Sequence, residues 1–503
     1  MAHHFANDIP AHLLMWQRVR EYAVPPSMIE TATARRAVGD WAGACAAARI
    51  DVDLDLRAVR DRHGTDVVTQ LRADLRRLAP DLLRWHMPRI APGGRLRPGL
   101  TLSLARYRSS GATPPQLVVR TPPPWADAGQ RMSLAVWEGS GNGVPGHHPH
   151  PHPDRRFRLD LHRHLWDSVR SGELARRCGG GGAPSMAPPD RSTAPGRPVL
   201  PVLPVLPDRP DRPTVQDSAW AVTTWAEEAE LLLRAEGRTR GAFTVRLGAQ
   251  GRAVLELVAP DDSHAPTFRP LREALPPQEV APLPVLPEAA ARVLPDLELL
   301  RAGLVEAERL HPLVAAALAA FGPAPVACPA SEPGDPHRVE CRGEVHRIAL
   351  RDGVLTAIDH DPAQLRREEL LVALGGPALP CLRAIEAVHR NPEELPAIRE
   401  RLGHGDFAGA LAVVEGLLGP GAVLRDGPLR EELESAAARR IDHGLFRAGL
   451  VAVHPAAGAV GGGNASGVGH TEAGHRPRLD RSTPYDMRRK RSSRARPRTA
   501  LHS

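Results

Sequence analysis

The sequence predicts a helix-dominated α+β protein in which two globular units are joined by a Pro/Gly-rich linker. Three observations support this fold class. Residues 178–214 combine a run of four glycines with repeated Pro-Val-Leu triplets. On both sides of this stretch, apolar residues recur at helical spacing, and short alternating runs between them indicate strands. The 503 residues, of which 42% are hydrophobic, are enough for two or three domains with cores of their own.

The linker prediction follows from the chemistry of glycine and proline. Glycine raises the entropic cost of order, while proline removes backbone donors and favours extended polyproline II structure. Because such a segment has no means to build a packed core, residues 1–177 and 215–455 are expected to fold as separate units. A second Pro-rich patch leaves open a division of the later unit near residues 270–295. The Arg-rich tail, residues 456–503, is expected to be disordered.

In the N-terminal unit, apolar spacing predicts helices over residues 11–24, 28–38 and 65–78. Asp40 is the expected N-cap of a further helix, and its pattern GD(W/F)AGA returns at Gly405, which predicts a second helical hairpin there. The alternation of Asp51, Asp53 and Asp55 lacks the glycine of a calcium loop and instead predicts a capped entry into helix 56–63. Strands are expected at 100–104, 116–120 and 132–137, followed by a helix over 157–170.

In the C-terminal unit, a clear amphipathic helix is expected over residues 218–235, followed by strands at 242–247 and 253–258. Helices are predicted at 296–310 and 313–320, then a three-stranded meander at 338–341, 345–350 and 354–358. Asp361 followed by proline is typical of a capped start, here of helix 363–374. Four more helical runs carry the chain to about residue 453.

The net charge of +7 is a property of the tail. The segment from Arg476 onward sums to +8, so residues 1–475 sum to −1. An argument for nucleic-acid binding must therefore rest on a local patch or on the tail, where Arg488, Arg489, Lys490 and Arg491 are the densest run.

Several catalytic chemistries are excluded by the residues themselves. Lys490 is the only lysine, which removes the lysine of P-loops, of kinases and of Schiff-base enzymes. The chain has no HExxH or GxSxG motif. Gly141, Gly143 and Gly146 match GxGxxG, but Pro145 and the following HHPHPHP forbid the helix that such a motif needs. No cofactor is predicted.

A His-rich loop is the strongest sign of metal chemistry. His147, His148, His150 and His152 could gather zinc or nickel, although a tolerated loop insertion explains the run equally well. The five cysteines form no CxxC pair, so Cys328 and Cys341, together with His346, are interpreted as core or strand residues. His360-Asp361 is interpreted as a helix start rather than as a catalytic pair.

A local basic patch spans residues 65–108 and carries a net charge of +6. It could hold a phosphate, an acidic peptide or a nucleic-acid backbone, and a solvated helix face is the alternative. Trp85 is expected in the core rather than as a stacking platform. The candidate ligand- or partner-binding residues are Arg84, Trp85, His86, Arg89, Arg95 and Arg97.

Residues 32–177, with ATARRAVGDWAGACAAAR, LAPDLLRWHMPR and HPDRRFRLDLHRHLW, resemble long proteins of high-GC Gram-positive bacteria for which no activity is known. The resemblance therefore supplies no site residues. With no signal peptide and no apolar run of about 18 residues, we expect a cytoplasmic location and no membrane span. The leading hypothesis is a non-enzymatic interaction or scaffold protein with protein partners. The alternatives are a nucleic-acid-associated regulatory protein and a metal-dependent hydrolase.

Overall fold

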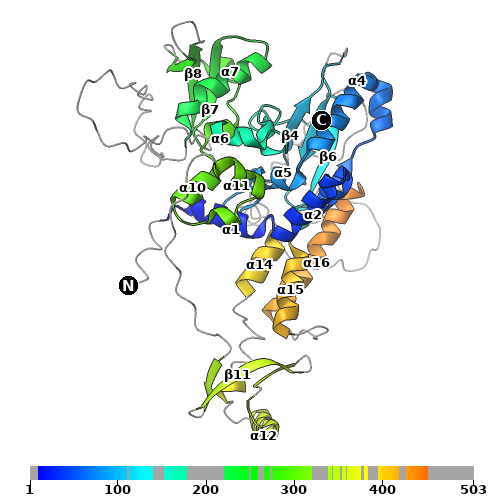
Figure 1. Cartoon of the computed structure of the whole chain (residues 1–503), viewed down its shortest axis with the longest axis vertical. Helices are drawn as coiled ribbons and strands as arrows, with labels where there is room; N and C mark the ends of the chain where they lie inside the picture. Colours follow the sequence, from blue (N-terminus) through cyan, green and yellow to red (C-terminus); the bar gives the residue numbers. More distant parts are fainter. Residues whose placement is uncertain are drawn as a thin grey trace, which may run out of the picture.

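The computed structural model describes most of the chain, with gaps (Figure 1). The ranges are 9–109, 113–139, 152–177, 220–248, 251–258, 265–271, 275–319, 338–341, 344–351, 354–357, 359–374, 379–382, 395–418 and 426–450. The predicted linker and the predicted disordered tail lie outside these residues. The described part is a mixed α/β structure with more helix than strand and with small sheets, as the sequence predicts. None of the described helices is long and apolar enough to cross a membrane.

The N-terminal helices confirm the predicted pattern. They are α1 (Ala11–Tyr22), α2 (Pro26–Ala37) and α3 (Trp41–Ala47). Pro26 occupies the first position of α2, where its missing N–H has no helical partner to lose. The carboxylate of Asp40 accepts a hydrogen bond from the Gly43 N–H at 2.8 Å and so caps α3.

A four-stranded sheet in the order β1-β6-β5-β4 follows (Figure 1). Its strands are β1 (Ile50–Asp53), β4 (Thr101–Arg106), β5 (Gln116–Arg120) and β6 (Met132–Trp137). β1 runs parallel to β6, and the other pairs are antiparallel. β1 was not predicted from the sequence, because Asp51, Asp53 and Asp55 were interpreted together as the entry to a helix, although Asp51 and Asp53 alternate with apolar residues as in a strand. Its short edge position tolerates them.

Helix α4 (Leu56–Arg77) begins at the N-cap Asp55, whose carboxylate accepts hydrogen bonds from the N–H groups of Arg57 and Ala58. This confirms the capped entry. Gly64, at φ 86°, breaks the helix where the sequence predicts a new start. Helix α5 (Pro80–His86), the short hairpin β2 (Arg89–Ile90) and β3 (Arg95–Leu96), and the 3-10 turn η2 (Ala128–Gln130) complete the elements before residue 139.

The predicted helix over 157–170 is wrong. Only the 3-10 turns η3 (Arg163–Leu165) and η4 (Ser171–Glu173) form there, before the short α6 (Leu174–Arg177). The N–H groups of Asp154 and Asp160 donate to the carbonyls of Thr101 and Ser103 at 2.8 Å, so the stretch runs beside β4 instead of coiling. Phe157, Leu159, Leu165 and Trp166 are buried among the sheet and helices, whereas Val169 is exposed, and this burial outweighs the helical spacing.

Residues 220–291 have an apolar cluster of their own. Trp220 forms a bridge to Arg292, so the predicted helix begins later, after the turn η5 (Val222–Thr224), as α7 (Trp225–Ala235). The helix packs on an antiparallel sheet whose first two strands were predicted. The sheet consists of β7 (Gly241–Arg246), β8 (Arg252–Val258) and β9 (Thr267–Pro270), and the short helices α8 (Pro277–Val280) and α9 (Glu288–Ala291) follow.

Residues 293–318 belong to the core of the N-terminal half. Val293, Leu297 and Val314 are members of the same buried cluster as Val19, Leu75 and Leu134. The helices that carry them are α10 (Pro295–Arg301) and α11 (Pro312–Leu318), with η6 (Ala307–Arg309) between them. Helix α10 ends earlier than predicted because the chain turns at Gly303, at φ 65°.

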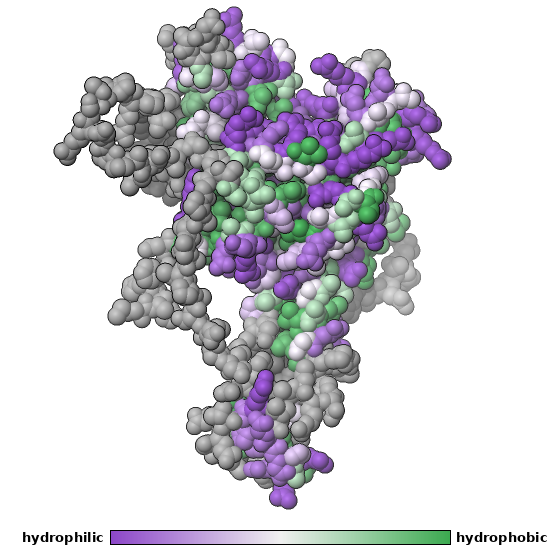
Figure 2. All heavy atoms as spheres, in the orientation of Figure 1, coloured by the Kyte–Doolittle hydropathy of each residue, from purple (hydrophilic) through white to green (hydrophobic). Residues whose placement is uncertain are grey.

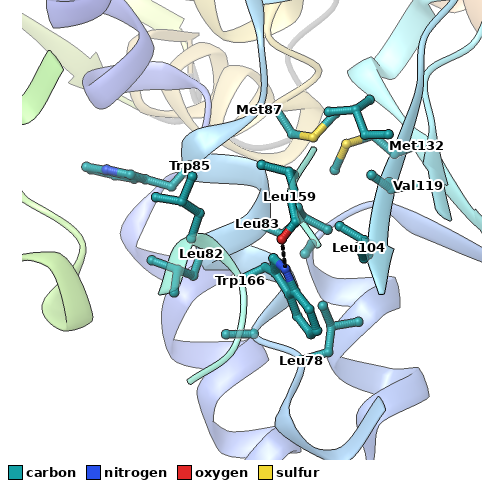
Figure 3. Packing of buried hydrophobic residues seen from close by; sticks show 14 of the residues in the cluster. Leu78, Leu82, Leu83, Trp85, Met87, Leu104, Val119, Met132, Leu159 and Trp166 are labelled. Atoms are coloured by element: carbon teal, nitrogen blue, oxygen red, sulfur yellow. Dashed lines mark hydrogen bonds between the residues drawn. The ribbon is translucent and has the colours of Figure 1, made fainter. Parts of the chain in front are cut away.

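Figure 3 shows the centre of this core, where Trp166 lies among Leu78, Leu83 and Leu104 and donates from its indole Nε1 to the Leu159 carbonyl at 3.0 Å. Because this interior takes residues from both sides of 178–214, the expectation of two self-sufficient interiors is corrected. The physical reason is that the apolar faces of α10 and α11 are covered by α1, α6 and η4.

Two further clusters follow. The small unit, meaning the described residues between 338 and 382, contains β10 (Arg338–Cys341), β11 (Glu344–Arg351), β12 (Val354–Ala357) and α12 (Pro362–Ala373). This confirms the predicted meander and the Asp361 cap, which accepts from the Ala363 N–H. The last cluster joins α14 (Leu395–Gly403), α15 (Phe407–Leu418) and α16 (Pro428–Arg447).

Candidate functional site

Arg84 and Trp85, two of the predicted partner-binding residues, lie in the core and are 0% and 1% exposed. The Arg84 guanidinium donates to the carbonyls of Ala23 at 3.1 Å and Gln130 at 2.6 Å, and it also reaches Ala48 at 3.4 Å. Ala23 and Ala48 are the C-caps of α1 and α3, where backbone carbonyls carry partial negative charge. Arg84 is therefore a buried structural clamp, and its prediction as a contact residue is corrected.

Trp85 belongs to a buried hydrogen-bond network that joins residues before the predicted linker to a residue after it. Its indole N–H donates to the Asp296 carboxylate at 3.1 Å. Arg20 donates to the same carboxylate at 2.7 Å and to the Trp85 carbonyl at 2.8 Å. The Arg20 guanidinium also lies 4.4 Å from the centre of the Trp85 ring. Trp85 is therefore a core residue, as the sequence predicts.

His86, Arg89 and Arg97, three more of the predicted residues, line one cavity of about 510 Å³. Its walls come from α1, from residues 86–97, from residues 156–159 and from residues 285–298. The last two walls are tied together because the Glu288 N–H donates to the Arg156 carbonyl at 2.9 Å. The volume is in the range of cavities that take small molecules.

The basic patch over 65–108 does not form one surface. Arg95 is absent from the cavity lining, and its guanidinium pairs with Asp127 at 2.7 Å. Arg77 lies 3.9 Å from Asp167, and Arg106 pairs with Asp160. In the fold, acidic residues that lie far away in sequence come beside these arginines, and a window-based charge count does not include them.

The cavity wall is strongly basic. Seven arginines line it, against only two acidic residues, Glu288 and Glu298. Three of the arginines are compensated by carboxylates: Arg20 by Asp296, Arg156 by Asp154 and Arg158 by Asp160. Arg97 and Arg292 have no ion pair with any described residue. The wall therefore carries positive charge that the described residues leave uncompensated.

Aromatic faces lie beside these guanidinium groups. Arg97 lies 6.0 Å from the centre of the Phe157 ring, and Arg292 lies 4.5 Å from that of Trp220. Trp16 contributes a third ring to the wall, and most of the other lining residues are apolar. Such a wall offers stacking and hydrophobic contact to the body of a ligand while arginines hold its charged end.

Polar atoms at the cavity wall lack partners. His86 Nε2, Arg89 Nε and Arg97 Nε are buried and have no hydrogen-bond partner among the described residues. Burial, with repulsion from Arg20 and His311, lowers the pKa of His86 well below its usual range, so its ring is neutral. Burial, with repulsion from Arg20, lowers the pKa of Arg89 to about 9. Burial is the larger cause in both cases, and the repulsion from neighbouring cations adds to it; a bound anion would offset that repulsion.

The cavity carries no assembled nucleophile. Among its described lining residues there is no Cys, Ser, Thr or Lys. Of the two histidines and two glutamates in the lining, His12 and Glu298 lie 3.8 Å apart, and the His12 side chain is half-exposed. This arrangement is suited to binding charge and apolar surface, and it offers no base next to a nucleophile.

The other predicted sites are only partly described. His147, His148 and His150 lie outside the described residues, as do Arg488, Arg489, Lys490 and Arg491. His152 is exposed and contacts the Trp137 ring edge-on, with ring centres 6.2 Å apart. The described part of the chain therefore does not test the His-rich metal site or the basic tail.

His162 does not join His86 in the cavity. Its ring is buried between the Arg158 carbonyl and Glu228, which it reaches at 3.0 and 3.1 Å. Arg177 holds the same carboxylate through two hydrogen bonds of 2.7 and 2.6 Å. This group fastens α7 to the N-terminal half and is structural.

Sequence reasoning missed two groups of residues. The first is the second wall of the cavity, with Arg156, Trp220 and Arg292, for which no local pattern gives a signal. The second is the set Cys341, His360 and Cys381, which come together in the small unit. Their spacing matches no short motif, so only the fold brings them into one place.

Comparison with protein-family models, with curated proteins and with solved structures finds no match for this chain.

Proposed function

We propose that this protein is a non-enzymatic binding protein whose cavity takes a small molecule with a phosphate or carboxylate group and an apolar body. The observation that carries the proposal is that seven arginines and only two glutamates line a wall rich in aromatic and aliphatic residues, and that Arg97 and Arg292 lie in it without an ion pair to a described residue. Charge-assisted hydrogen bonds from guanidinium groups are the usual means of holding such anions.

Within the described residues, the cavity supports anion binding better than it supports nucleic-acid binding by the Arg patch or hydrolysis at the cavity. A nucleic-acid interface needs exposed arginines along a surface, whereas Arg84 and Arg89 are buried. Hydrolysis would need an activated nucleophile or metal-bound water, and the described cavity wall provides neither a thiol nor a hydroxyl group.

The test is a fluorescence titration of the full chain, because Trp16 and Trp220 line the cavity. The probes are anilinonaphthalene sulfonate, an aromatic anion, and inorganic pyrophosphate as its competitor. We expect one saturable site for the aromatic probe, displaced by pyrophosphate and weakened by salt. The Arg97→Ala variant should bind about tenfold more weakly, since one charge-assisted hydrogen bond contributes about 1.4 kcal/mol or more.

Arg234→Ala is the matched control, because Arg234 is exposed on α7 and pairs with Glu230 away from the cavity. It should bind both probes as the parent protein does. Equal affinity of the parent and of an Arg97→Ala, Arg292→Ala double variant would refute the proposed cavity site.

A further inference from the structure

Three metal-ligating side chains meet in the small unit. Cys341 ends β10, His360 lies between β12 and α12, and Cys381 lies in the helical turn at 380–382. Each offers one ligand atom, and these three atoms lie within 4.8 Å of one another. All three side chains are buried, although two cysteines and a histidine have no sequence-local reason to meet.

The strand register brings a fourth such side chain to the same face. Val339 lies opposite His346 in the β10–β11 pair. Residues two apart on a strand share a face, and so do directly opposed residues, so Cys341, Val339 and His346 project from one side of the sheet. His346 is 7% exposed, and its ring stacks on that of His360 with centres 4.0 Å apart.

We propose that Cys341, His346, His360 and Cys381 bind one Zn²⁺ ion as a structural site. Thiolate and imidazole ligands together select zinc over the hard cations, and structural zinc sites use four protein ligands. Zn–S bonds of about 2.3 Å and Zn–N bonds of about 2.0 Å place tetrahedral ligand atoms about 3.3–3.8 Å apart. A contraction of about 1 Å and a turn of the His346 ring would therefore close the site.

The small unit has a structural need for such an ion. Among the side chains that the structure describes in it, the apolar cluster has five buried residues, namely Cys341, Ala357, Leu365, Leu379 and Cys381. The unit lies apart from the main body at the lower end of Figure 1, and where Figure 2 colours it, mostly hydrophilic side chains face outward. Units of this size usually need a metal, disulfides or oligomerisation to compensate for a small core. A metal that joins four segments would supply that stabilisation.

The test uses the full chain, purified under reducing conditions and loaded with Co²⁺ alone as a spectroscopic probe. We expect the visible bands of tetrahedral cobalt and a thiolate-to-metal charge-transfer band, both lost when one equivalent of Zn²⁺ is added. Cys381→Ser should lose the charge-transfer intensity of one thiolate and weaken binding by more than about 100-fold, beyond what outer-shell changes cost.

Two variants separate this site from other sources of metal binding. Cys45→Ala removes a buried thiol of the main core and should leave the spectrum unchanged. Replacing His147, His148, His150 and His152 together by alanine should also leave the thiolate band intact, because those residues supply no sulfur.

His360→Cys keeps the site testable if Cys381→Ser fails to fold. It replaces one zinc ligand by another, so binding should persist with a stronger thiolate band. The proposal is overturned by cobalt spectra without a thiolate band, by an unchanged band in Cys381→Ser, or by peptide mapping that shows a Cys341–Cys381 disulfide in a sample purified without reductant.

Discussion

At the residue scale, the main feature of this protein is that its buried charges hold segments together. Arg84 satisfies backbone carbonyls at the ends of two helices. Glu228 on α7 accepts hydrogen bonds from His162 and Arg177, which belong to the N-terminal half. Burial acts to raise the pKa of Glu228, but the hydrogen bonds from His162 and Arg177 outweigh it and lower the pKa to about 2.

This lowered pKa predicts an acid-sensitive contribution to stability. The folded state binds the Glu228 proton less readily than the unfolded state, whose carboxyl keeps the usual pKa of 4.5. The contribution is therefore fully present above about pH 4.5 and is lost as the pH falls towards about 2. Glu228→Gln should lower the free energy of unfolding by about 3 kcal/mol at pH 7 and by much less at pH 3.

Urea denaturation at pH 7, 5, 4 and 3 measures this difference between the parent and the variant. Glu227→Gln is the matched control, because Glu227 is the exposed neighbour on the same helix. A stability difference between Glu228→Gln and the parent that stays constant from pH 7 to pH 3 would contradict the assignment.

At the element scale, the repeated pattern GD(W/F)AGA contains both the turn that ends one helix and the cap that begins the next. Asp40 caps α3 and pairs with Arg35 at 3.2 Å, and Asp406 caps α15 and pairs with Arg401 at 3.0 Å. Gly39 and Gly405 precede these caps at φ 78° and 80°. Both hairpins were predicted from the sequence because cap, glycine and apolar spacing all act within a few residues.

The two connectors differ in what touches their first glycine. A Cβ at Gly405 would lie 2.2 Å from the Gly129 carbonyl oxygen, whereas a Cβ at Gly39 meets nothing within 4 Å. Gly39→Ala should therefore cost only the left-handed backbone strain, about 1 kcal/mol. Gly405→Ala should cost about 1–3 kcal/mol more, because it also displaces the α14–α15 hairpin from the loop at η2.

Urea denaturation followed by circular dichroism compares the two variants under one condition. Equal losses of stability in Gly39→Ala and Gly405→Ala would show that the second hairpin is not seated against Gly129. The different cost of the two substitutions could not be predicted from the sequence, because the two glycines have the same sequence context and different neighbours in space.

Element prediction fails where tertiary contacts override local spacing. Residues 157–170 have helical apolar spacing, yet backbone hydrogen bonds to β4 take up Asp154 and Asp160. β1 was missed for a different reason, because its aspartates were interpreted as the entry to a helix although they alternate with Ile50 and Val52 as in a strand. For residues 157–170 the deciding partner lies elsewhere in the chain, so no window of neighbouring residues contains the information.

At the scale of the whole molecule, residues on both sides of 178–214 share one interior. Arg20 and Trp85 meet Asp296, and His311 meets Asp81 at 3.0 Å, all in buried positions. The cavity lies at this junction, which is why sequence reading found His86, Arg89 and Arg97 but not Arg292. The residues of one wall lie close together in the sequence and could be predicted from it, whereas those of the opposite wall come beside them only in the fold.

A shared interior predicts that cutting the chain will not separate it. A protease site inserted after Ala194 should yield two fragments that elute together in size-exclusion chromatography, since the buried cluster joins them. Asp296→Arg, which places a like charge against Arg20, should weaken this association. Separation of the fragments of the otherwise unchanged chain would contradict the shared core.

The central claim is that an anion binds in the cavity between these two walls. Hydrogen exchange of the full chain with and without saturating anilinonaphthalene sulfonate tests it most directly, because the measurement locates the ligand. We expect slower exchange in residues 86–97 and 285–292 together, and no such change in the Arg97→Ala, Arg292→Ala double variant. Protection confined to other segments, or protection that persists in the double variant, would contradict it.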